Sequence, residues 1–128
     1  MKYIGIDYGS KRIGIAVGTD IDNMAFPREV VPNTKRAQEY IAQFIEKEGI
    51  GAVLLGYSAD LDGTDNPIQK RINAFKVYIE ETLHLPVYFE PEFFSSIQAT
   101  HIQGKNDMVD ASAAAIILQS FLDKKANR

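Results

Sequence analysis

The first eighteen residues constrain the fold of this chain more than any other stretch. Two short apolar runs, Tyr3–Ile6 and Ile13–Val17, flank a tip made of glycine, serine, lysine and arginine. Two such runs around a tip of small and polar residues are typical of a β-hairpin. Asp7 comes directly after the first run, where a carboxylate is well placed to face a ligand at the carboxyl end of a strand. Because aspartate also favours turns, its position alone leaves a turn-forming role equally open.

The remaining pattern predicts one α/β domain over residues 1–128. Ala25–Val31 is predicted as a third strand that Pro32 ends, because proline cannot donate a hydrogen bond to a sheet. The other predicted elements are a helix capped by Thr34 and ending near Gly49, a strand over Gly51–Gly56, a helix over Pro67–Leu83, a strand over Pro86–Glu90, a short helix opened by Ser95 and Gln98, and a helix over Met108–Asp123.

Chain connectivity indicates how these strands assemble. Right-handed crossovers would place the fourth and fifth strands beside the first and parallel to it. The expected fold class is α/β, with a five-stranded mixed sheet of three antiparallel strands followed by two parallel strands, and with helices on both faces. The carboxyl ends of the parallel strands would then share one edge of the sheet with Asp7.

Composition narrows the possible functions. The chain is 45% apolar and 24% charged, and no apolar run approaches the roughly 20 residues that a membrane span needs. The absence of cysteine and of a signal-peptide pattern at the N-terminus fits a cytoplasmic protein. The formal net charge of −3 provides no overall basic surface for nucleic acid. Binding of that kind must therefore depend on local cations or on metal ions.

Several acids are predicted to reach the same edge as Asp7. The fifth strand ends at Glu90 and is followed closely by Glu92, and the last helix begins near Asp107 and Asp110. Neighbouring strands lie about 4.8 Å apart, so carboxylates from these positions can converge on a divalent cation. A carboxylate set without cysteine favours Mg²⁺ or Mn²⁺ over zinc. Two such ions about 3.5–4 Å apart can activate water and stabilise the leaving oxygen during phosphodiester cleavage.

Each of these acids also has a plain structural explanation. Asp107 is an ordinary helix cap, and Asp110 lies in a first helical turn, where the helix dipole favours a carboxylate. Glu92 can be a solvated loop acid, and Glu90, within a strand, is a weaker candidate still. The acids of the loop after the fourth strand resemble turn formers rather than calcium ligands. They are Asp60, Asp62 and Asp65.

Three stretches resemble one known family. Asp7-Tyr-Gly-Ser-Lys-Arg-Ile-Gly-Ile-Ala-Val-Gly is similar to the opening of the YqgF/RuvX family, which comprises Holliday junction resolvase-like proteins and pre-16S rRNA nucleases with an RNase H-like fold. Gly56-Tyr-Ser-Ala-Asp-Leu-Asp-Gly-Thr-Asp-Asn-Pro is similar to that family's Asp-Gly-Thr loop, and Val109-Asp-Ala-Ser-Ala-Ala-Ala-Ile-Ile-Leu-Gln to its terminal helix. The matches occur in the family's order and span nearly the whole chain.

The resemblance implies specific site residues. Asp7, Glu92 and Asp110 match the family's acids, and are implied to be catalytic and to hold Mg²⁺ or Mn²⁺. The chain departs from the family around Glu92, where Pro91 and Phe93 replace the flanking acid and arginine. It departs again in the segment before the last aspartate, which is short and retains Lys105 as its one basic residue.

The basic residues near the predicted edge are few. Lys11 and Arg12 match the family at the hairpin tip, and Lys70 and Arg71 lie on the second helix, where they could contact a phosphate strand or form a solvated face. The expected partner is nucleic acid, either an rRNA precursor or branched DNA, with no membrane association, and the chain is expected to be a monomer or a homodimer.

These observations lead to three functional hypotheses. The first is a metal-dependent nuclease that hydrolyses phosphodiester bonds in the 5′-end maturation of pre-16S rRNA or in branched DNA. The second is a relative that binds nucleic acid or protein without catalysis, as the substitutions around Glu92 suggest. The third is a phosphate-binding module similar to actin-type and sugar-kinase-type ATPases. That class needs two such domains, whereas 128 residues supply one.

Overall fold

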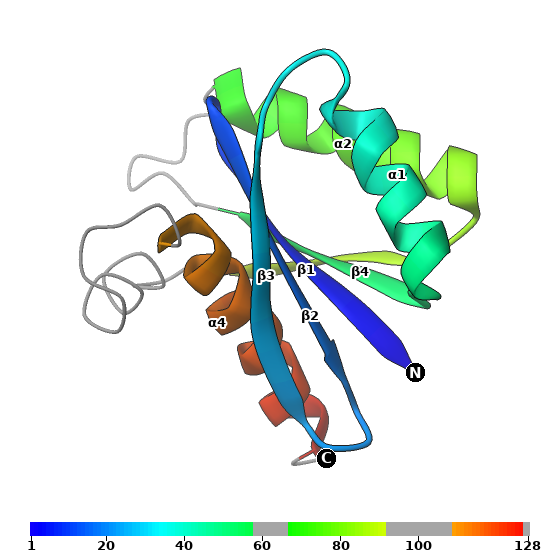
Figure 1. Cartoon of the computed structure of the whole chain (residues 1–128), viewed down its shortest axis with the longest axis vertical. Helices are drawn as coiled ribbons and strands as arrows, with labels where there is room; N and C mark the ends of the chain where they lie inside the picture. The colour runs from blue at the N-terminus through cyan, green and yellow to red at the C-terminus, as the bar shows by residue number, and fades with distance from the viewer. Residues whose placement is uncertain (58–66, 92–108, 127–128) are drawn as a thin grey trace.

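A computed structural model of the chain describes residues 1–57, 67–91 and 109–126. Within these ranges the chain forms five strands and three helices (Figure 1). Their bounds are β1 Lys2–Tyr8, β2 Arg12–Thr19, β3 Met24–Pro32, α1 Ala37–Glu48, β4 Ala52–Tyr57, α2 Pro67–Leu83, β5 Val87–Pro91 and α4 Val109–Ala126. None of the helices in these ranges is long and apolar enough to span a membrane.

The five strands form one mixed sheet in the order β3-β2-β1-β4-β5. The pairs β1/β2 and β2/β3 are antiparallel, whereas β1/β4 and β4/β5 are parallel. This arrangement confirms the predicted mixed sheet and the predicted position of the parallel strands beside β1. The carboxyl ends of β1, β4 and β5 therefore lie along one edge of the sheet, as expected from the connectivity.

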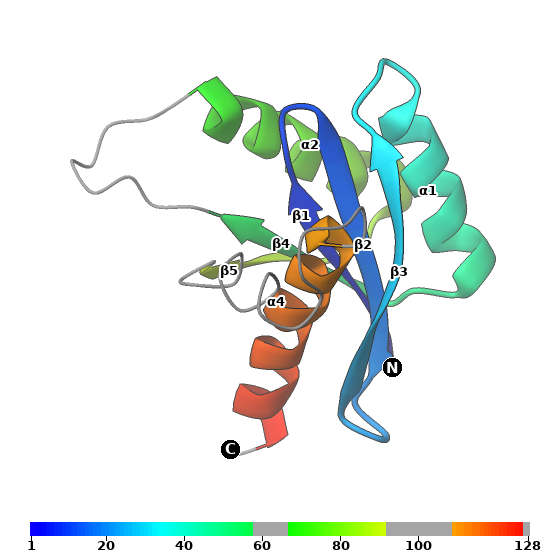
Figure 2. The same ribbon diagram turned by 60° about the vertical axis from the view of Figure 1, so that its left-hand side comes forward.

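Helices cover both faces of the sheet, as predicted, with α1 and α2 on one face and α4 on the other (Figures 1 and 2). Alternate residues of β1 pack into the two cores on opposite sides of the sheet, because successive strand side chains point to opposite faces. Ile4 and Ile6 belong to the larger core beneath α1 and α2, whereas Tyr3 packs with Leu118 and Leu122 of α4. By the same alternation, Asp7 lies on the α4 face of the sheet.

The connection from β3 to α1 differs from the prediction in two ways. β3 continues through Pro32, which pairs with Arg12, because β3 is an edge strand and the missing proline N–H is not needed for a second neighbour. The predicted cap Thr34 does not cap α1, which begins at Ala37 after Arg36. Instead, the Thr34 hydroxyl accepts a hydrogen bond from the Arg36 amide at 3.3 Å, within a turn that precedes the helix. The short helix predicted near Ser95 lies outside the described residues.

The contact between α4 and the sheet is unusually close at Gly5 of β1. A Cβ atom added to Gly5 would lie 2.7 Å from the Ala114 carbonyl oxygen and 2.8 Å from the Leu118 Cβ atom. On β2, a Cβ atom added to Gly18 would lie 3.3 Å from a Leu118 methyl group and 2.5 Å from the Met24 carbonyl oxygen. The absence of side chains at these positions therefore lets the α4 backbone approach β1 and β2 directly.

Substituting Gly5 with alanine should displace α4 and destabilise the protein. Because the atoms met by the new methyl group include a backbone oxygen, we expect Gly5→Ala to lower the free energy of unfolding by about 1–3 kcal/mol. Chemical denaturation followed by circular dichroism measures this change.

The matched control is Gly51→Ala, whose methyl group would meet mainly the movable end of the Met1 side chain. Equal stability of the Gly5→Ala and wild-type proteins would contradict the close approach of α4.

Candidate active site

Asp7 lies near the carboxyl end of β1 with a glycine beside it on each neighbouring strand. On β2 it pairs with Gly14. On β4 the pairing of Ile6 with Leu55 places Gly56 next to Asp7 in register. Residues in register on adjacent strands point to the same face, so no side chain flanks the Asp7 carboxylate within the sheet. The partly exposed Asp7 therefore has backbone rather than side chains beside it on both neighbouring strands, which favours the close approach of an ion or a phosphate.

The start of α4 is positioned at the same end of the sheet as Asp7. Tyr3, at the opposite end of β1, contacts the Phe121 ring at 5.4 Å between centroids, whereas Gly5 contacts Ala114. α4 and β1 thus run in opposite directions, so the N-terminal end of α4 lies toward the Asp7 end of β1. The backbone of Asp110 is one helical turn, about 6 Å, before Ala114. Asp110 therefore lies in the first turn of α4, on the Asp7 side.

The proposed acid cluster lies largely outside the described part of the chain. Glu92 and Asp107 lie outside the described residues, and so does the side chain of Asp110. β5, which ends at Pro91, brings the chain to the same edge one residue before Glu92. Within the described part of the chain, no three His, Cys, Asp or Glu side chains come close enough together to hold a metal ion. The metal-binding roles of Asp7, Glu92 and Asp110 therefore stay predictions.

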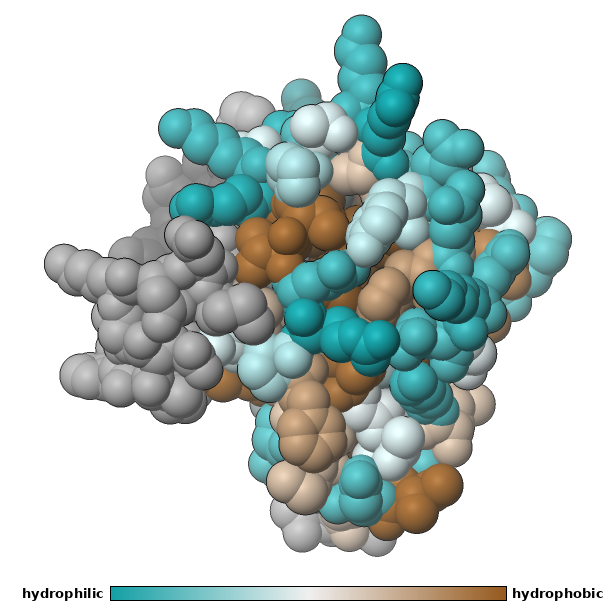
Figure 3. All heavy atoms as spheres, viewed as in Figure 1, coloured by the Kyte–Doolittle hydropathy of each residue, from teal (hydrophilic) through white to brown (hydrophobic). Residues whose placement is uncertain are grey.

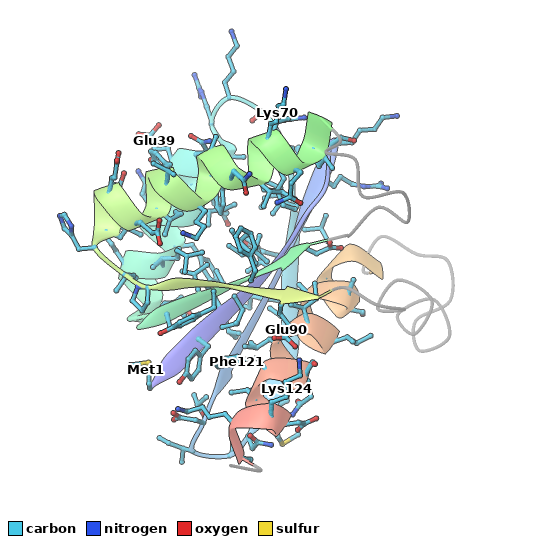
Figure 4. All side chains as sticks on the ribbon, turned by 180° about the vertical axis from the view of Figure 1, so that it is seen from behind. Met1, Glu39, Lys70, Glu90, Phe121 and Lys124 are labelled. Carbon is cyan, nitrogen blue, oxygen red and sulfur yellow. The ribbon has the colours of Figure 1, made fainter. Side chains whose placement is uncertain are left out.

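Glu90 is a buried acid with a structural role. It pairs with Gly56, which places it on the same face and at the same level as Asp7, two strands away. Only 5% of Glu90 is exposed. Its Oε1 atom accepts hydrogen bonds from Ser120 Oγ at 2.9 Å and Lys124 Nζ at 2.6 Å. Figure 4 shows Glu90 and Lys124 beside each other, joining β5 to α4. The Glu90 carboxylate thus connects β5 to α4. This structural role agrees with the expectation that Glu90 is a weaker candidate than the other acids.

The basic residues named from the sequence lie at the same end of the molecule as Asp7. Lys11 and Arg12 are exposed at the hairpin tip, where the Gly9 amide donates to the Arg12 carbonyl oxygen at 2.9 Å. Lys70 lies on the outer side of α2 and points away from the sheet (Figure 4). The Arg71 guanidinium lies 5.9 Å from the centre of the Tyr8 ring.

Asn33 supports the hairpin tip and was not singled out from the sequence. Its side-chain amide donates to the Gly9 carbonyl oxygen at 2.8 Å, and its backbone amide donates to the Lys11 carbonyl oxygen at 2.9 Å. These bonds tie the turn that carries Lys11 to the end of β3. No local motif signals this role, because it depends on the pairing of β3 with β2. Knowledge of the hairpin register would have been needed to find it.

The perturbed carboxyl groups that the structure resolves lie at the opposite end of β1. The hydrogen bond from the N-terminal amine lowers the pKa of Asp20, and the hydrogen bond from Lys2 lowers the pKa of Glu48. Burial, reinforced by the neighbouring charge of Asp20, raises the pKa of the Tyr3 phenol. These groups are attached to the strand end that is remote from Asp7. Their shifted pKa values arise from local ion pairing and burial, and they do not indicate a catalytic site.

The bond between Glu90 and Lys124 should contribute measurably to stability. Among the described residues, Lys124→Ala would leave the buried carboxylate with the Ser120 hydroxyl as its one remaining partner, so we expect a loss of about 1–2 kcal/mol in the free energy of unfolding. Thermal or urea denaturation of the variant measures the loss.

The matched control for this measurement is Lys125→Ala, which removes an exposed lysine from the same helical turn. Adding Glu90→Gln to Lys124→Ala should restore part of the stability, since no buried charge remains. A loss of the same size in both lysine variants would show that Glu90 does not depend on Lys124.

Sequence comparisons relate the chain to one family. A family model described as "RuvX: Holliday junction resolvase" matches residues 1–124. A protein of Nitratidesulfovibrio vulgaris named "Putative pre-16S rRNA nuclease" is 36% identical over 139 residues, which cover 100% of this chain and 97% of that protein. A protein of the same name from Ralstonia nicotianae is 35% identical over 125 residues, with 94% of this chain and 85% of that protein covered.

Solved structures with a similar fold include two resolvases. RuvC of T. thermophilus, in complex with a Holliday junction substrate, has a TM-score of 0.66 and 16% identity over 99% of this chain and 96% of that one. The Fowlpox virus resolvase, in complex with Holliday junction DNA, has a TM-score of 0.66 and 14% identity over 98% of this chain and 99% of that one. At such low identity the likeness concerns the fold, and it confirms the predicted RNase H-like architecture.

The family match and the curated relatives agree with each other along nearly the whole chain. They favour the nuclease interpretation over that of a relative without catalysis. On these grounds the chain belongs to the RuvX family of Holliday junction resolvase-like nucleases.

Proposed function

We propose that this chain is a metal-dependent nuclease that hydrolyses phosphodiester bonds in the 5′-end maturation of pre-16S rRNA. The observation that carries the proposal is the position of Asp7, at the carboxyl end of β1, between Gly14 and Gly56, on the face that α4 covers. The names of the curated relatives support an rRNA precursor as the substrate. Branched DNA is the second substrate class, because the family model is described as a Holliday junction resolvase.

Asp7, Glu92 and Asp110 are the proposed ligands of Mg²⁺ or Mn²⁺. The glycines beside Asp7 leave space for an ion at its carboxylate, and oxygen ligands without cysteine suit a hard cation. β5 ends at Pro91, one residue before Glu92, and Asp110 lies in the first turn of α4, which begins on the Asp7 side. A bound ion would supply Lewis-acid chemistry for the attack of water on phosphorus.

The basic residues at this end of the molecule are proposed to orient the nucleic acid. Lys11 and Arg12 project from the hairpin tip that directly follows Asp7, and Lys70 and Arg71 extend the cationic surface along α2. Their charges would offset the repulsion between the acids and the phosphate backbone. This local arrangement allows phosphate binding although the net charge of the chain is −3. A cytoplasmic location and a monomeric or homodimeric state stay predictions from the sequence.

Cleavage assays with carboxamide variants test the catalytic role of the acids. Asp7→Asn and Asp110→Asn should each reduce metal-dependent cleavage about 100-fold or more, because each removes a charge from the reacting centre. The assay follows labelled precursor rRNA, single-stranded RNA and a four-way DNA junction with Mg²⁺, Mn²⁺ or EDTA.

Glu39→Gln, which neutralises an exposed acid on α1, is the control and should cleave like the wild type. Cleavage that survives Asp7→Asn would place the active site elsewhere. Preference for the four-way junction over the RNA substrates would select branched DNA.

Salt-dependent binding tests the hairpin tip. Each lysine or arginine that contacts a phosphate adds about one unit to the slope of log K against log salt concentration. The double variant Lys11→Ala with Arg12→Ala should therefore lower this slope by up to about 2, as measured by fluorescence anisotropy in EDTA.

The double variant Lys47→Ala with Lys125→Ala removes the same charge from exposed positions at the far ends of α1 and α4. It should leave the slope unchanged. Equal slopes for the two double variants would show that the hairpin tip does not contact phosphate.

A further inference from the structure

A hollow of about 640 Å³ opens between the start of α1 and the start of α2, at the same end of the molecule as the hairpin tip. The residues around it are polar, basic or uncharged, and none of the described residues that line it is acidic. They include Tyr8 of β1, Thr34 and Lys35 of the turn before α1, Gln38 of α1, and Arg71 and Ala74 of α2. Asp7 does not line this hollow, and Lys35 has no role in the site described above.

Arg71 lines the hollow beside an aromatic ring. Its guanidinium lies 5.9 Å from the centre of the Tyr8 ring. The Tyr8 ring is itself buried and packs against Phe75, with 5.3 Å between the ring centres. A guanidinium that rests on a fixed ring loses less conformational freedom when it binds a ligand. Its planar fork of N–H donors matches the oxygens of a phosphate group.

The turn before α1 adds further positive potential to the hollow. Lys35 is exposed there, and it precedes Arg36 at the N-terminus of α1. Arg36 makes no side-chain capping hydrogen bond, so the positive end of the helix dipole faces this region without a local carboxylate cap. Glu39, in the first turn of α1, does not line the hollow. A cation from the turn before α1, a cation from α2 and a helix N-terminus together favour an anion in this hollow.

The hollow is close to Asp7 but lies on the other face of the sheet. Tyr8 and Asp7 are consecutive residues of β1, with Cα atoms about 3.8 Å apart, and their side chains point to opposite faces. In Figure 3, hydrophilic side chains gather at the end of the molecule where Figure 1 places the β3–α1 turn and the start of α2. The hairpin tip with Lys11 joins the two faces. A nucleic acid at Asp7 can therefore reach the hollow around the end of the hairpin.

We propose that this hollow binds a backbone phosphate of the nucleic acid substrate, on a segment away from the bond that is cleaved. The proposal rests on the proposed nuclease function, and it adds Lys35 and the hollow to the substrate contacts. Arg71 and Lys35 would both bind the phosphate, and Tyr8 would set the orientation of Arg71. This second contact would fix the direction in which a strand crosses the Asp7 edge.

A carboxylate placed in the hollow tests the proposal without removing any existing bond. Ala74→Glu introduces a negative charge at an exposed helical position that lines the hollow. We expect it to weaken binding of a labelled rRNA precursor fragment and of a four-way DNA junction about 10-fold, measured by fluorescence anisotropy in EDTA. Lys35→Ala should lower the salt slope by about 1.

Thr82→Glu is the matched control, since Thr82 is exposed on α2 about 12 Å along the helix from Ala74. It should bind nucleic acid like the wild type, and circular dichroism should show all variants folded. Equal affinities for Ala74→Glu and Thr82→Glu would overturn the proposal. Inorganic phosphate is the second probe. If phosphate raises the melting temperature of the wild type but not of Ala74→Glu, while both bind nucleic acid equally, the hollow is a small-anion site and the proposal is wrong.

These outcomes are separable from a failure of the proposed nuclease function. The binding measurements contain EDTA and do not depend on cleavage. A wrong assignment of the catalytic acids would appear as cleavage by Asp7→Asn, with the effect of Ala74→Glu on binding unchanged. Absence of any nucleic acid binding by the wild type would overturn both proposals.

Discussion

The direct contact of α4 with the backbone of β1 determines the arrangement of the candidate active site. Gly5 leaves no side chain between the strand and the Ala114 carbonyl oxygen, so the helix lies as close to the sheet as a backbone allows. Because Leu118 and Leu122 pack beside Tyr3, the direction of the helix along β1 is also determined. The start of α4 is thereby placed at the Asp7 end. The Glu90 carboxylate secures the other half of the same helix through Ser120 and Lys124.

Much of this fold follows from local sequence patterns. The hairpin, the two parallel strands and the helices that cover both faces are encoded by apolar periodicity, and the strand order follows from the handedness of crossovers. The start of α1 was predicted wrongly because Thr34 has a good capping side chain, but the pairing of β3 with β2 extends the strand through Pro32, and the helix begins only at Ala37. Tertiary pairing outweighed local preference at that position.

The candidate site is harder to predict from the sequence than the fold is. Asp7 stands out because an acid follows an apolar strand, and Lys11 and Arg12 stand out at a turn. The contributions of Gly14 and Gly56 depend on strand register, and those of Lys35 and Arg71 depend on the meeting of two helices. Such relations join residues distant in the chain and leave no local signal. Net charge is equally uninformative here, because a chain with an excess of acids still places several cations, among them Lys11, Lys35 and Arg71, at the Asp7 end.

The meeting of Gly5 with Ala114 also has a consequence for synthesis. The ribosome makes β1 and β2 early, yet the helix that covers one face of them is made about a hundred residues later. Until then, Tyr3 and the bare backbone of Gly5 have no covering layer, and long-range contacts of this kind form slowly. The arrangement of residues around Asp7 therefore cannot be completed before α4 is made. A nuclease with this fold assembles its candidate site only once the chain has been synthesised through α4.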